Sequence, residues 1–516
     1  MKLRLKYIFP VLFFFMSLSV RPLWAAIPIS VDEREHRLTE MKNKLQQALD
    51  KFKKQEEKSN FQPTLRDLPN AALSILILGK NPKEAERYLH MAFHEQYMDR
   101  SDKNYGQVPW QVGHPEIKDQ NAIEFTMQAM GSILTHYGER LSPNIKEELR
   151  PHLEAAFEAI RRHKVPVSYT NIFLMKTTNL ILVGEAIGDT KAADEGYALL
   201  QQWADDTAVE GIHEYDSPTY YAADLNSLVV GYLYAAKPEG KELYKKILDY
   251  FWTEMAANAF GPAATVAGPH SRDYDFLFGT GGTELYFYLE GLRDQMKIGG
   301  LDFEKSLMVE GLSSAGYHPS EQVLRWAKPS EKTIFQIWGN KPGEDRTLYM
   351  TPDFAIGSVS SDYGPQNKNI TVDFLSEKQP FPVLSIIPDL QDNPYGKTKF
   401  KDASGHSKPH IWPMSPVTVQ SKGTILALLN TVPTHEKKAY PSLATNIVFP
   451  TQVDQIVLNG QTVHLDSPTE ILIPDEKAIL GIRQGQSVVA VRIFRANGYK
   501  QKTKIGFKNR SRKGLN

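Results

Sequence analysis

The sequence predicts an α+β protein of more than one domain, with a helical region first and an all-β region after it. From about Asp32 to about Leu312, apolar residues recur at the spacing of an α-helix. After about His318 the apolar runs become short, are rich in β-branched residues and are separated by turn signals. Because the strands follow the helices and do not alternate with them, separate layers or domains are expected, not a parallel α/β sheet.

The helical region, residues 27–320, contains helices of two kinds. Some segments are apolar almost all round, which is typical of helices buried on two sides. These segments are Ala71–Leu78, Ile123–Tyr137, Leu174–Ile187 and Leu225–Leu233. Less apolar helices, such as Pro143–Arg162 and Lys191–Trp203, lie between them. The alternation predicts concentric layers of helices, as in an (α/α) toroid built as an incomplete barrel of helical hairpins.

The second region, residues 321–516, contains short strands separated by turns. The strand-like runs are Ile370–Phe374, Val417–Val419, Thr424–Leu429, Gln455–Leu458, Glu470–Ile473 and Ser487–Phe494. The dipeptide Asn459-Gly460 lies between two such runs and favours the type I′ turn of a β-hairpin. An antiparallel β-sandwich is the expected form.

The first 26 residues are typical of a secretory signal peptide. Basic residues come first, at Lys2, Arg4 and Lys6. The apolar run Tyr7–Val20 follows, with small residues for cleavage near Ala25 or Ala26. This run is short for a membrane span, which needs about 20 residues, although an uncleaved anchor is the alternative. We therefore expect an exported protein, periplasmic or secreted, without stable membrane insertion.

The composition excludes several kinds of function. The chain has no cysteine, which rules out disulfides, thiolate metal sites and a cysteine nucleophile. Its 60 basic residues balance 60 acidic ones, so no strong field favours nucleic acid. The pair His90 and His94 has helical spacing but lacks the glutamate of the zinc-protease motif. No metal or cofactor is expected, and no EF-hand-like spacing indicates a structural Ca²⁺.

Polar and aromatic residues gather in four clusters along the helical region. The clusters are Tyr105–Trp110 with Asp119, Asn121 and Glu124; Ser168–Asn171; Gly211–Tyr221; and Gly268–Tyr274. They recur roughly every 45 to 60 residues, about the length of two helices with their loops. If each period is one helical hairpin, every cluster returns to the same rim of the barrel. We therefore expect these residues to line one cleft.

The order of residues in these clusters resembles the α/α-toroid polysaccharide lyases that act on chondroitin, hyaluronate, alginate or glucuronan. Those enzymes place an Asn on one inner helix, a His or Glu with a Tyr on the next hairpin, and an Arg on the one after. This order is met by Asn171, then His213, Glu214 and Tyr220, then Arg272. The resemblance implies a toroid followed by a sandwich, and β-elimination on a polymer that contains uronate. The chain departs from the chondroitin-type pattern at His270, close to Arg272, so the base remains one of Tyr220, His270 and His213.

The expected chemistry assigns a role to each residue. Asn171 and Arg272 would neutralise the uronate carboxylate, which makes the neighbouring proton more acidic. Tyr220 or a histidine would transfer protons, and a buried Glu214 would share a proton with the substrate. An anionic polysaccharide is the expected partner. The residues expected to bind it are Trp110, Asn121, Glu124, Tyr215 and Tyr274.

Simpler explanations remain for each residue. Asn171 would serve equally as a helix N-cap, Arg272 as the partner of Asp273 or Asp275, and Tyr220 as a core aromatic. For the whole protein, the alternatives are a non-catalytic glycan-binding surface protein and a glycoside hydrolase with two carboxylates. The carboxylates available to a hydrolase are Asp119, Glu124, Glu214, Asp216 and Asp273.

Overall fold

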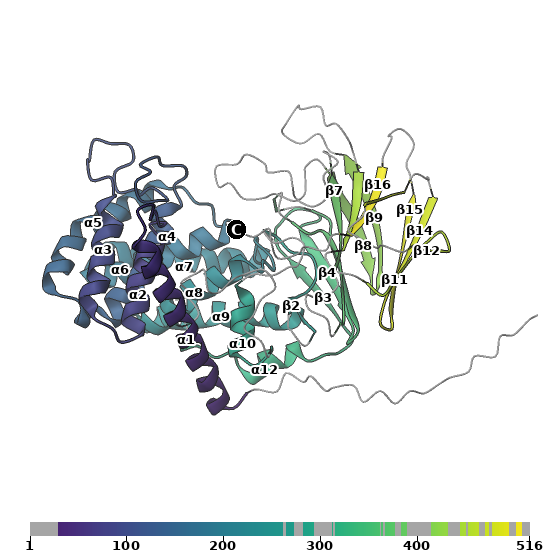
Figure 1. The fold of residues 1–516 in the computed structure, drawn as a ribbon, viewed down its shortest axis with the longest axis horizontal. Helices are drawn as coiled ribbons and strands as arrows, with labels where there is room; N and C mark the ends of the chain where they lie inside the picture. The colour runs from purple at the N-terminus through teal and green to yellow at the C-terminus, as the bar shows by residue number, and fades with distance from the viewer. Residues whose placement is uncertain are drawn as a thin grey trace, which may run out of the picture.

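The structure, a computed structural model, has an N-terminal helical region and a C-terminal region of mostly antiparallel sheets, which lie side by side (Figure 1). It describes residues 29–261, 265–272, 282–293, 312, 315–361, 363–364, 367–376, 383–389, 414–431, 444–449, 453–463, 470–473, 477–494 and 502–507. The expected signal peptide, residues 1–26, and the expected binding residue Tyr274 lie outside these ranges.

Buried helices form the centre of the helical region. The sequence predicted this for α2, α4, α6 and α8, which are buried along most of their length and pack against one another in chain order. Helices α3, α5 and α7 lie between them in the chain, and α9 follows α8; each of these four helices buries one face. The helices are α1 Val31–Glu56, α2 Asp67–Ile77, α3 Pro82–His94, α4 Ala122–His136, α5 Pro143–Arg162, α6 Thr170–Ile187, α7 Thr190–Glu210, α8 Tyr220–Tyr234, α9 Pro238–Asn258, α10 Thr283–Leu289 and α12 Glu321–Leu324.

Local sequence signals fix several helix ends. The side chain of Ser142 accepts a hydrogen bond from the backbone of Ile145, and Pro143 occupies the first turn of α5. The side chain of Asp189 caps α7 in the same way. Gly188 ends α6 with φ of 78°, a left-handed conformation that glycine adopts without steric cost. These signals fix the α4–α5 and α6–α7 connections. The first three polar clusters lie in the alternate connections, α3–α4, α5–α6 and α7–α8, and the fourth follows α9.

The first helix is fastened to the end of the helical region by two buried arginines. Arg34 donates to Glu290 at 3.2 Å and to the carbonyl of Ala315 at 2.7 Å. Arg37 donates to the carbonyls of Tyr288 at 2.7 Å and Arg293 at 2.6 Å. Helix α1 also packs against both α2 and α10. The chain therefore returns at α10 to the helix with which it began.

The sheets follow in the second half of the chain. The largest has eight strands in the order β13-β16-β10-β7-β6-β5-β4-β3, antiparallel except for the parallel pair β10 and β16. A four-stranded sheet has the order β12-β11-β14-β15, and β8 pairs with β9 alone. The strands are β3 Lys332–Ile337, β4 Asp345–Met350, β5 Phe354–Val359, β6 Ile370–Phe374, β7 Val383–Asp389, β8 Met414–Ser421, β9 Thr424–Thr431, β10 Ala444–Phe449, β11 Gln455–Leu458, β12 Gln461–Val463, β13 Glu470–Ile473, β14 Lys477–Gln484, β15 Ser487–Phe494 and β16 Lys502–Phe507.

The turn predicted at Asn459-Gly460 is confirmed. These two residues join β11 to β12, and Leu458 pairs with Gln461 across the hairpin. Both have positive φ, 50° for Asn459 and 84° for Gly460, as a type I′ turn requires.

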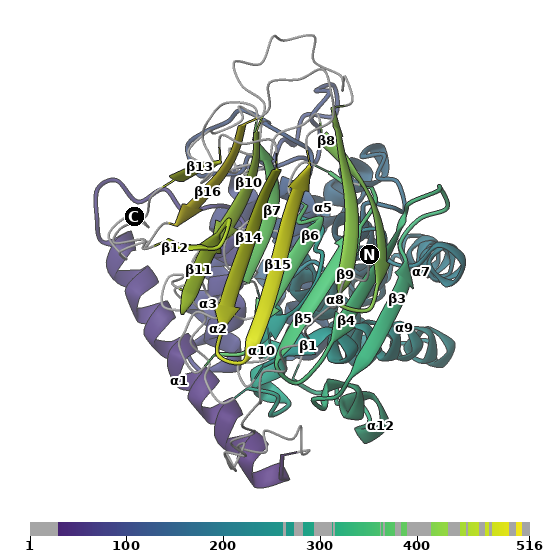
Figure 2. The same ribbon diagram turned by 90° about the vertical axis from the view of Figure 1, so that its right-hand side faces the viewer.

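The eight-stranded sheet packs on both faces. One face meets the four-stranded sheet (Figure 2), and Val372 and Phe374 share an apolar core there with Leu480 and Ile482. On the other face, Leu348 packs with residues of the helical region. These include Phe260 and Ala267, at or next to the short antiparallel strands β1 (Ala259–Phe260) and β2 (Thr265–Val266). Because the sheet lies directly against the helical region, its side chains reach the polar clusters.

Among the described helices, none is both long and apolar enough to cross a bilayer.

Candidate functional site

Arg272 links a carboxylate to a tyrosine hydroxyl. One guanidinium nitrogen, Nη1, lies 3.1 Å from Oε1 of Glu214. The other, Nη2, donates to the hydroxyl of Tyr220 at 3.0 Å. The guanidinium also lies over two rings, with Cζ 4.6 Å from the centre of Tyr220 and 5.3 Å from that of Tyr169. The site is therefore organised around one cation held by a carboxylate and two aromatic side chains.

Glu214 is the buried anion of this group. Its side chain is fully buried, and its second oxygen accepts the backbone N–H of Asn171 at 2.9 Å. Burial raises the pKa of Glu214, while the Arg272 guanidinium and the Asn171 N–H oppose the rise. Both oxygens of the carboxylate thus have partners within the protein.

Asn171 is a helical residue and not a cap. It is the second residue of α6, and Tyr169 occupies the cap position. The sequence left open that Asn171 caps this helix, and the structure shows this alternative to be wrong. The side chain is 1% exposed, and neither its oxygen nor its nitrogen has a hydrogen-bond partner among the described residues. A buried amide without partners costs about 1–3 kcal/mol, which points to a water or ligand as the missing partner.

Sequence reasoning missed Asp224, another buried acid beside this group. It lies on α8, one helical turn after Tyr220, and is 1% exposed. Neither carboxylate oxygen has a hydrogen-bond partner within the described part of the chain. Burial raises its pKa well above the usual value, and the nearby charge of Glu214 adds to the rise. Asp224 stands in an apolar helical run, which gave no signal that it would lie near Glu214.

The contacts join all four sequence clusters. Tyr169 lies under Arg272, and its hydroxyl accepts from the side-chain amide of Asn121 at 3.4 Å. Since Glu214 and Tyr220 come from the third cluster and Arg272 from the fourth, residues 151 positions apart in the chain form one connected group. The sheet region adds Tyr363, whose hydroxyl donates to the carbonyl of Ser168 at 2.9 Å. Burial raises the pKa of Tyr363, Glu214 adds to the rise, and Arg272 opposes it.

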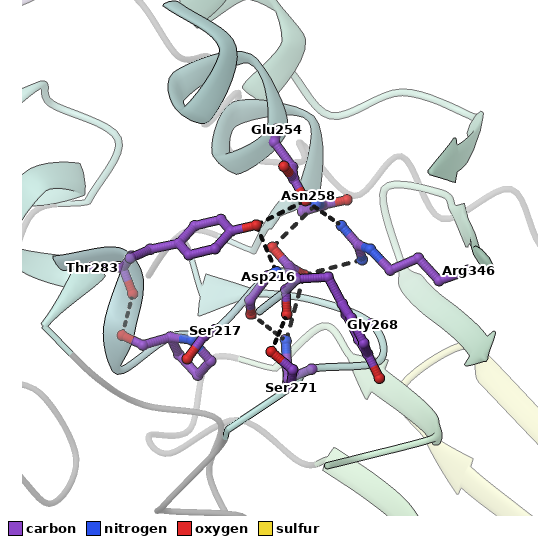
Figure 3. Close-up of polar contacts among 12 residues, drawn as sticks. Asp216, Ser217, Glu254, Asn258, Gly268, Ser271, Thr283 and Arg346 are labelled. Carbon is purple, nitrogen blue, oxygen red and sulfur yellow. Dashed lines mark hydrogen bonds and ion pairs between the residues drawn. The ribbon is translucent and has the colours of Figure 1, made fainter. Parts of the chain in front are cut away.

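A second, fully buried network is centred on Asp216 (Figure 3). Its Oδ1 accepts from the amide of Asn258 at 3.1 Å, and its Oδ2 lies 3.1 Å from Nη1 of Arg346 on β4. Nδ1 of His270 lies 3.1 Å from the backbone carbonyl of Asp216. Because a carbonyl only accepts, Nδ1 of His270 carries the proton in this contact. The network ties the loop before α8 to the eight-stranded sheet.

Glu254 and Tyr221 complete this network. The Tyr221 hydroxyl accepts the backbone N–H of Asp216 at 2.7 Å and donates to Glu254 at 2.9 Å. Arg346 lies 3.4 Å from the same Glu254 oxygen. Burial raises the pKa of Glu254 to about 7, with Arg346 acting in the opposite direction. Arg346 on the sheet therefore pairs with two buried carboxylates of the helical region, those of Asp216 and Glu254.

Two residues of these groups have strained backbones. Arg272 and Asp216 both have φ of 48°, in the left-handed region that side chains other than glycine rarely occupy. Such a conformation costs on the order of 1–3 kcal/mol, and it persists only where surrounding contacts hold it. The contacts of Arg272 with Glu214 and of Asp216 with Arg346 are of this kind.

Four of the expected site residues lie elsewhere. His213 turns away from Glu214, and its Nε2 lies 3.1 Å from Glu210. His270 is 2% exposed and belongs to the Asp216 network. Tyr215 is also buried, with its ring 4.9 Å from Trp338. Trp110 packs on Phe125 at 5.5 Å beside the helical core, the position of an ordinary core aromatic.

Comparison with known proteins finds a matching family model, but no activity is described for that family. A family model described as a domain of unknown function (DUF8769) matches residues 77–280. The matched part contains Asn171, Glu214, Tyr220 and Arg272, and it covers less than half of the chain. No curated protein matches the chain in sequence. The function therefore has to be argued from the geometry of the site.

Within the described ranges, one group of side chains has the spacing of metal ligands. Ligand atoms of Asp206, Glu210 and His213 all lie within 4.8 Å of one another. Nε2 of His213 is 3.1 Å from Glu210 and 3.5 Å from Asp206. A hydrogen bond from the imidazole N–H to Glu210 accounts for the shorter of these distances.

Proposed function

We propose that the protein is an exported polysaccharide lyase that cleaves a uronate-containing polymer by β-elimination. Its helical region would form an (α/α) toroid with the catalytic residues at one rim, and its sheets a β-sandwich against that toroid. The alternation of buried and one-sided helices supports the toroid, and the core shared by two facing sheets supports the sandwich. The observation that carries the function is the contact of Arg272 with both Glu214 and the Tyr220 hydroxyl.

The elimination needs charge stabilisation at the substrate carboxylate. When the proton at C5 leaves, negative charge develops on the carboxylate beside it, and donors placed there lower the barrier. The unpaired amide of Asn171 is buried beside Glu214, where it can donate to such a group. Arg272 supplies positive charge at the same place. Glu214 is bound by two donors already, so its role is to hold Arg272 and not to transfer the proton.

Tyr220 is the group best placed to transfer protons. Its side chain is partly exposed, and the Arg272 guanidinium stabilises negative charge on its oxygen. As a phenolate, it would take the C5 proton, and the electron pair of that C–H bond would form the C4–C5 double bond. The C4–O bond then breaks, and the leaving oxygen takes up a proton from the tyrosine. His270 and His213 are held by other partners, which favours Tyr220 among the three bases that the sequence left open.

The test is to incubate the purified protein with alginate, glucuronan, hyaluronate, chondroitin and pectate, and to follow the ultraviolet absorbance of a new C4–C5 double bond. We expect a rise with at least one polymer, and a loss of about 10²-fold or more in the variant Tyr220→Phe. The control Tyr349→Phe removes a hydroxyl that bonds Glu331 on the sheet region, and it should keep full activity.

Other results would replace the proposal. Reducing ends without absorbance would indicate a hydrolase, which needs two carboxylates around the bond. Binding of a polymer without either signal would indicate a glycan-binding protein. Full lyase activity in Tyr220→Phe would remove the tyrosine from the mechanism.

A further inference from the structure

A histidine outside the predicted clusters is held by a buried carboxylate. His163 follows directly on α5, and its Nδ1 lies 2.7 Å from Oε1 of Glu124. Glu124 is fully buried in the first turn of α4, and its other oxygen has no hydrogen-bond partner among the described residues. Burial raises the pKa of Glu124, and the contact with His163 opposes the rise. The carboxylate therefore fixes the orientation of the imidazole ring.

The second ring nitrogen of His163 is open to solvent. The side chain is 15% exposed, and Nε2 makes no hydrogen bond within the described part of the chain. Nε2 is therefore not a buried atom, and water reaches it. Because Nδ1 faces Glu124, the imidazole presents Nε2 in a fixed direction. When the ring is protonated, Nε2 carries an N–H that donates to an anion, and the ring is positively charged.

His163 stands close to the Arg272 group in the fold. Glu124 and Asn121 are three residues apart at the start of α4, so they are neighbours on one face of the helix. Asn121 donates to the hydroxyl of Tyr169, and Tyr169 lies under Arg272. Contacts link Arg272 to Tyr169 and Tyr169 to Asn121. Glu124, which contacts His163, lies one helical turn after Asn121. This row has the Arg272 guanidinium at one end and the His163 imidazole at the other, with an aromatic ring, an amide and the buried Glu124 carboxylate between them.

Further positive charge surrounds His163. Lys164 is exposed and has no ion-pair partner among the residues that the structure describes. Arg161, which pairs with Glu195 at 2.6 Å, and Arg162 precede His163, and Lys176 donates to its carbonyl at 3.2 Å. Basic residues at the end of a helix also interact with its dipole, but that role needs neither the buried Glu124 nor an open Nε2.

We propose that His163 and Lys164 form a second anion-binding subsite, which takes the carboxylate of a neighbouring sugar on the polymer bound at Arg272. The inference rests on the proposed function, since it assumes an acidic polysaccharide at the Arg272 group. It adds that the site binds at least two acidic sugars, one at each end of the row. Short substrates reach Arg272 alone, and longer ones reach His163 as well.

The test measures binding separately from turnover. In the background of Tyr220→Phe, acidic oligosaccharides of two to six sugars, prepared from the polymers named above, are titrated by calorimetry. His163→Gln should lower the affinity for the longer oligosaccharides by about tenfold, the effect of losing one charge-assisted hydrogen bond, and leave the disaccharide unchanged. The control His90→Gln removes a histidine that pairs with Glu148 at an exposed position on α3, and it should bind all lengths normally.

Each outcome decides the inference. Equal affinity of His163→Gln and the background protein for long oligosaccharides overturns it, as does an equal loss for all lengths. If His163→Gln melts at a much lower temperature, the exposed Lys164→Gln replaces it, with the same expected length dependence. A protein that binds no acidic oligosaccharide overturns both proposals. The two proposals can also be separated. If His163→Gln lowers the affinity for long oligosaccharides only, and the unmodified protein forms no unsaturated products, the subsite is kept and the lyase is rejected.

Discussion

Nη1 of Arg346 lies 3.1 Å from Oδ2 of Asp216, and this contact joins the eight-stranded sheet to the loop that carries Glu214 and leads to Tyr220 at the start of α8. Arg346 is 1% exposed, and Asp216 is fully buried. Asp216 also keeps a left-handed backbone, which this contact helps to hold. The geometry of the candidate site therefore depends on a residue of the sheet region that touches none of the residues in the Arg272 group directly.

Replacing Arg346 by methionine should destabilise the protein strongly. The change leaves Asp216 and Glu254 buried without their cation, and breaking a buried ion pair from one side costs about 3–5 kcal/mol. Chemical denaturation measures the free energy of unfolding. The exposed pair of Arg325 with Glu321 gives the control, since Arg325→Met should change that free energy by less than about 0.5 kcal/mol. A loss below about 1 kcal/mol for Arg346→Met would mean that the network contributes little.

The free energy of unfolding should also depend on pH through Glu254. Burial raises its pKa to about 7 from an ordinary 4.5, so between these values the folded protein binds a proton that the unfolded chain has lost. Stability then falls as pH rises through this window, by at most about 1.4 kcal/mol per pH unit for one group. Glu254→Gln keeps an acceptor for Tyr221 and removes this titration.

Denaturation at pH 5, 6, 7 and 8 checks this prediction. The unmodified protein should lose stability between pH 5 and pH 7, whereas Glu254→Gln should lose less. The free energy of unfolding of the variant minus that of the unmodified protein should therefore increase over this range. The exposed Glu35→Gln on α1 should follow the unmodified protein in parallel. Parallel curves for Glu254→Gln as well would contradict a raised pKa at this position.

No other cationic side chain should replace Arg272 in the candidate site. Its two nitrogens contact Glu214 and Tyr220 separately, and an ammonium group offers no such fork. We expect Arg272→Lys to lose about 10²-fold or more of lyase turnover, measured by the absorbance of unsaturated products. Arg100→Lys, at an exposed arginine 3.5 Å from Glu158, is the matched control. More than a tenth of normal turnover in Arg272→Lys would show that positive charge alone is enough.

The sequence by itself determined the secondary structure and the position of the polar loops. Apolar periodicity marked α4, α6 and α8 as buried helices, and Asn459-Gly460 marked a hairpin, because both signals are local properties of the chain. The recurrence of the four clusters indicated that they return to one end of the helices. The resemblance to the toroid lyases singled out Asn171, Glu214, Tyr220 and Arg272 within these clusters, and the structure brings them together.

Only the tertiary structure decided which side chains meet. His213 and Glu214 are adjacent in the chain, yet one faces Glu210 and the other Arg272. Asp224 and His163 gave no sequence signal, since their roles depend on neighbours 10 and 39 residues away, Glu214 and Glu124. Arg346 reaches Asp216 across 130 residues. A buried charge needs a partner in space and not in sequence, so pairings of this kind follow from how the helices and the sheet pack together.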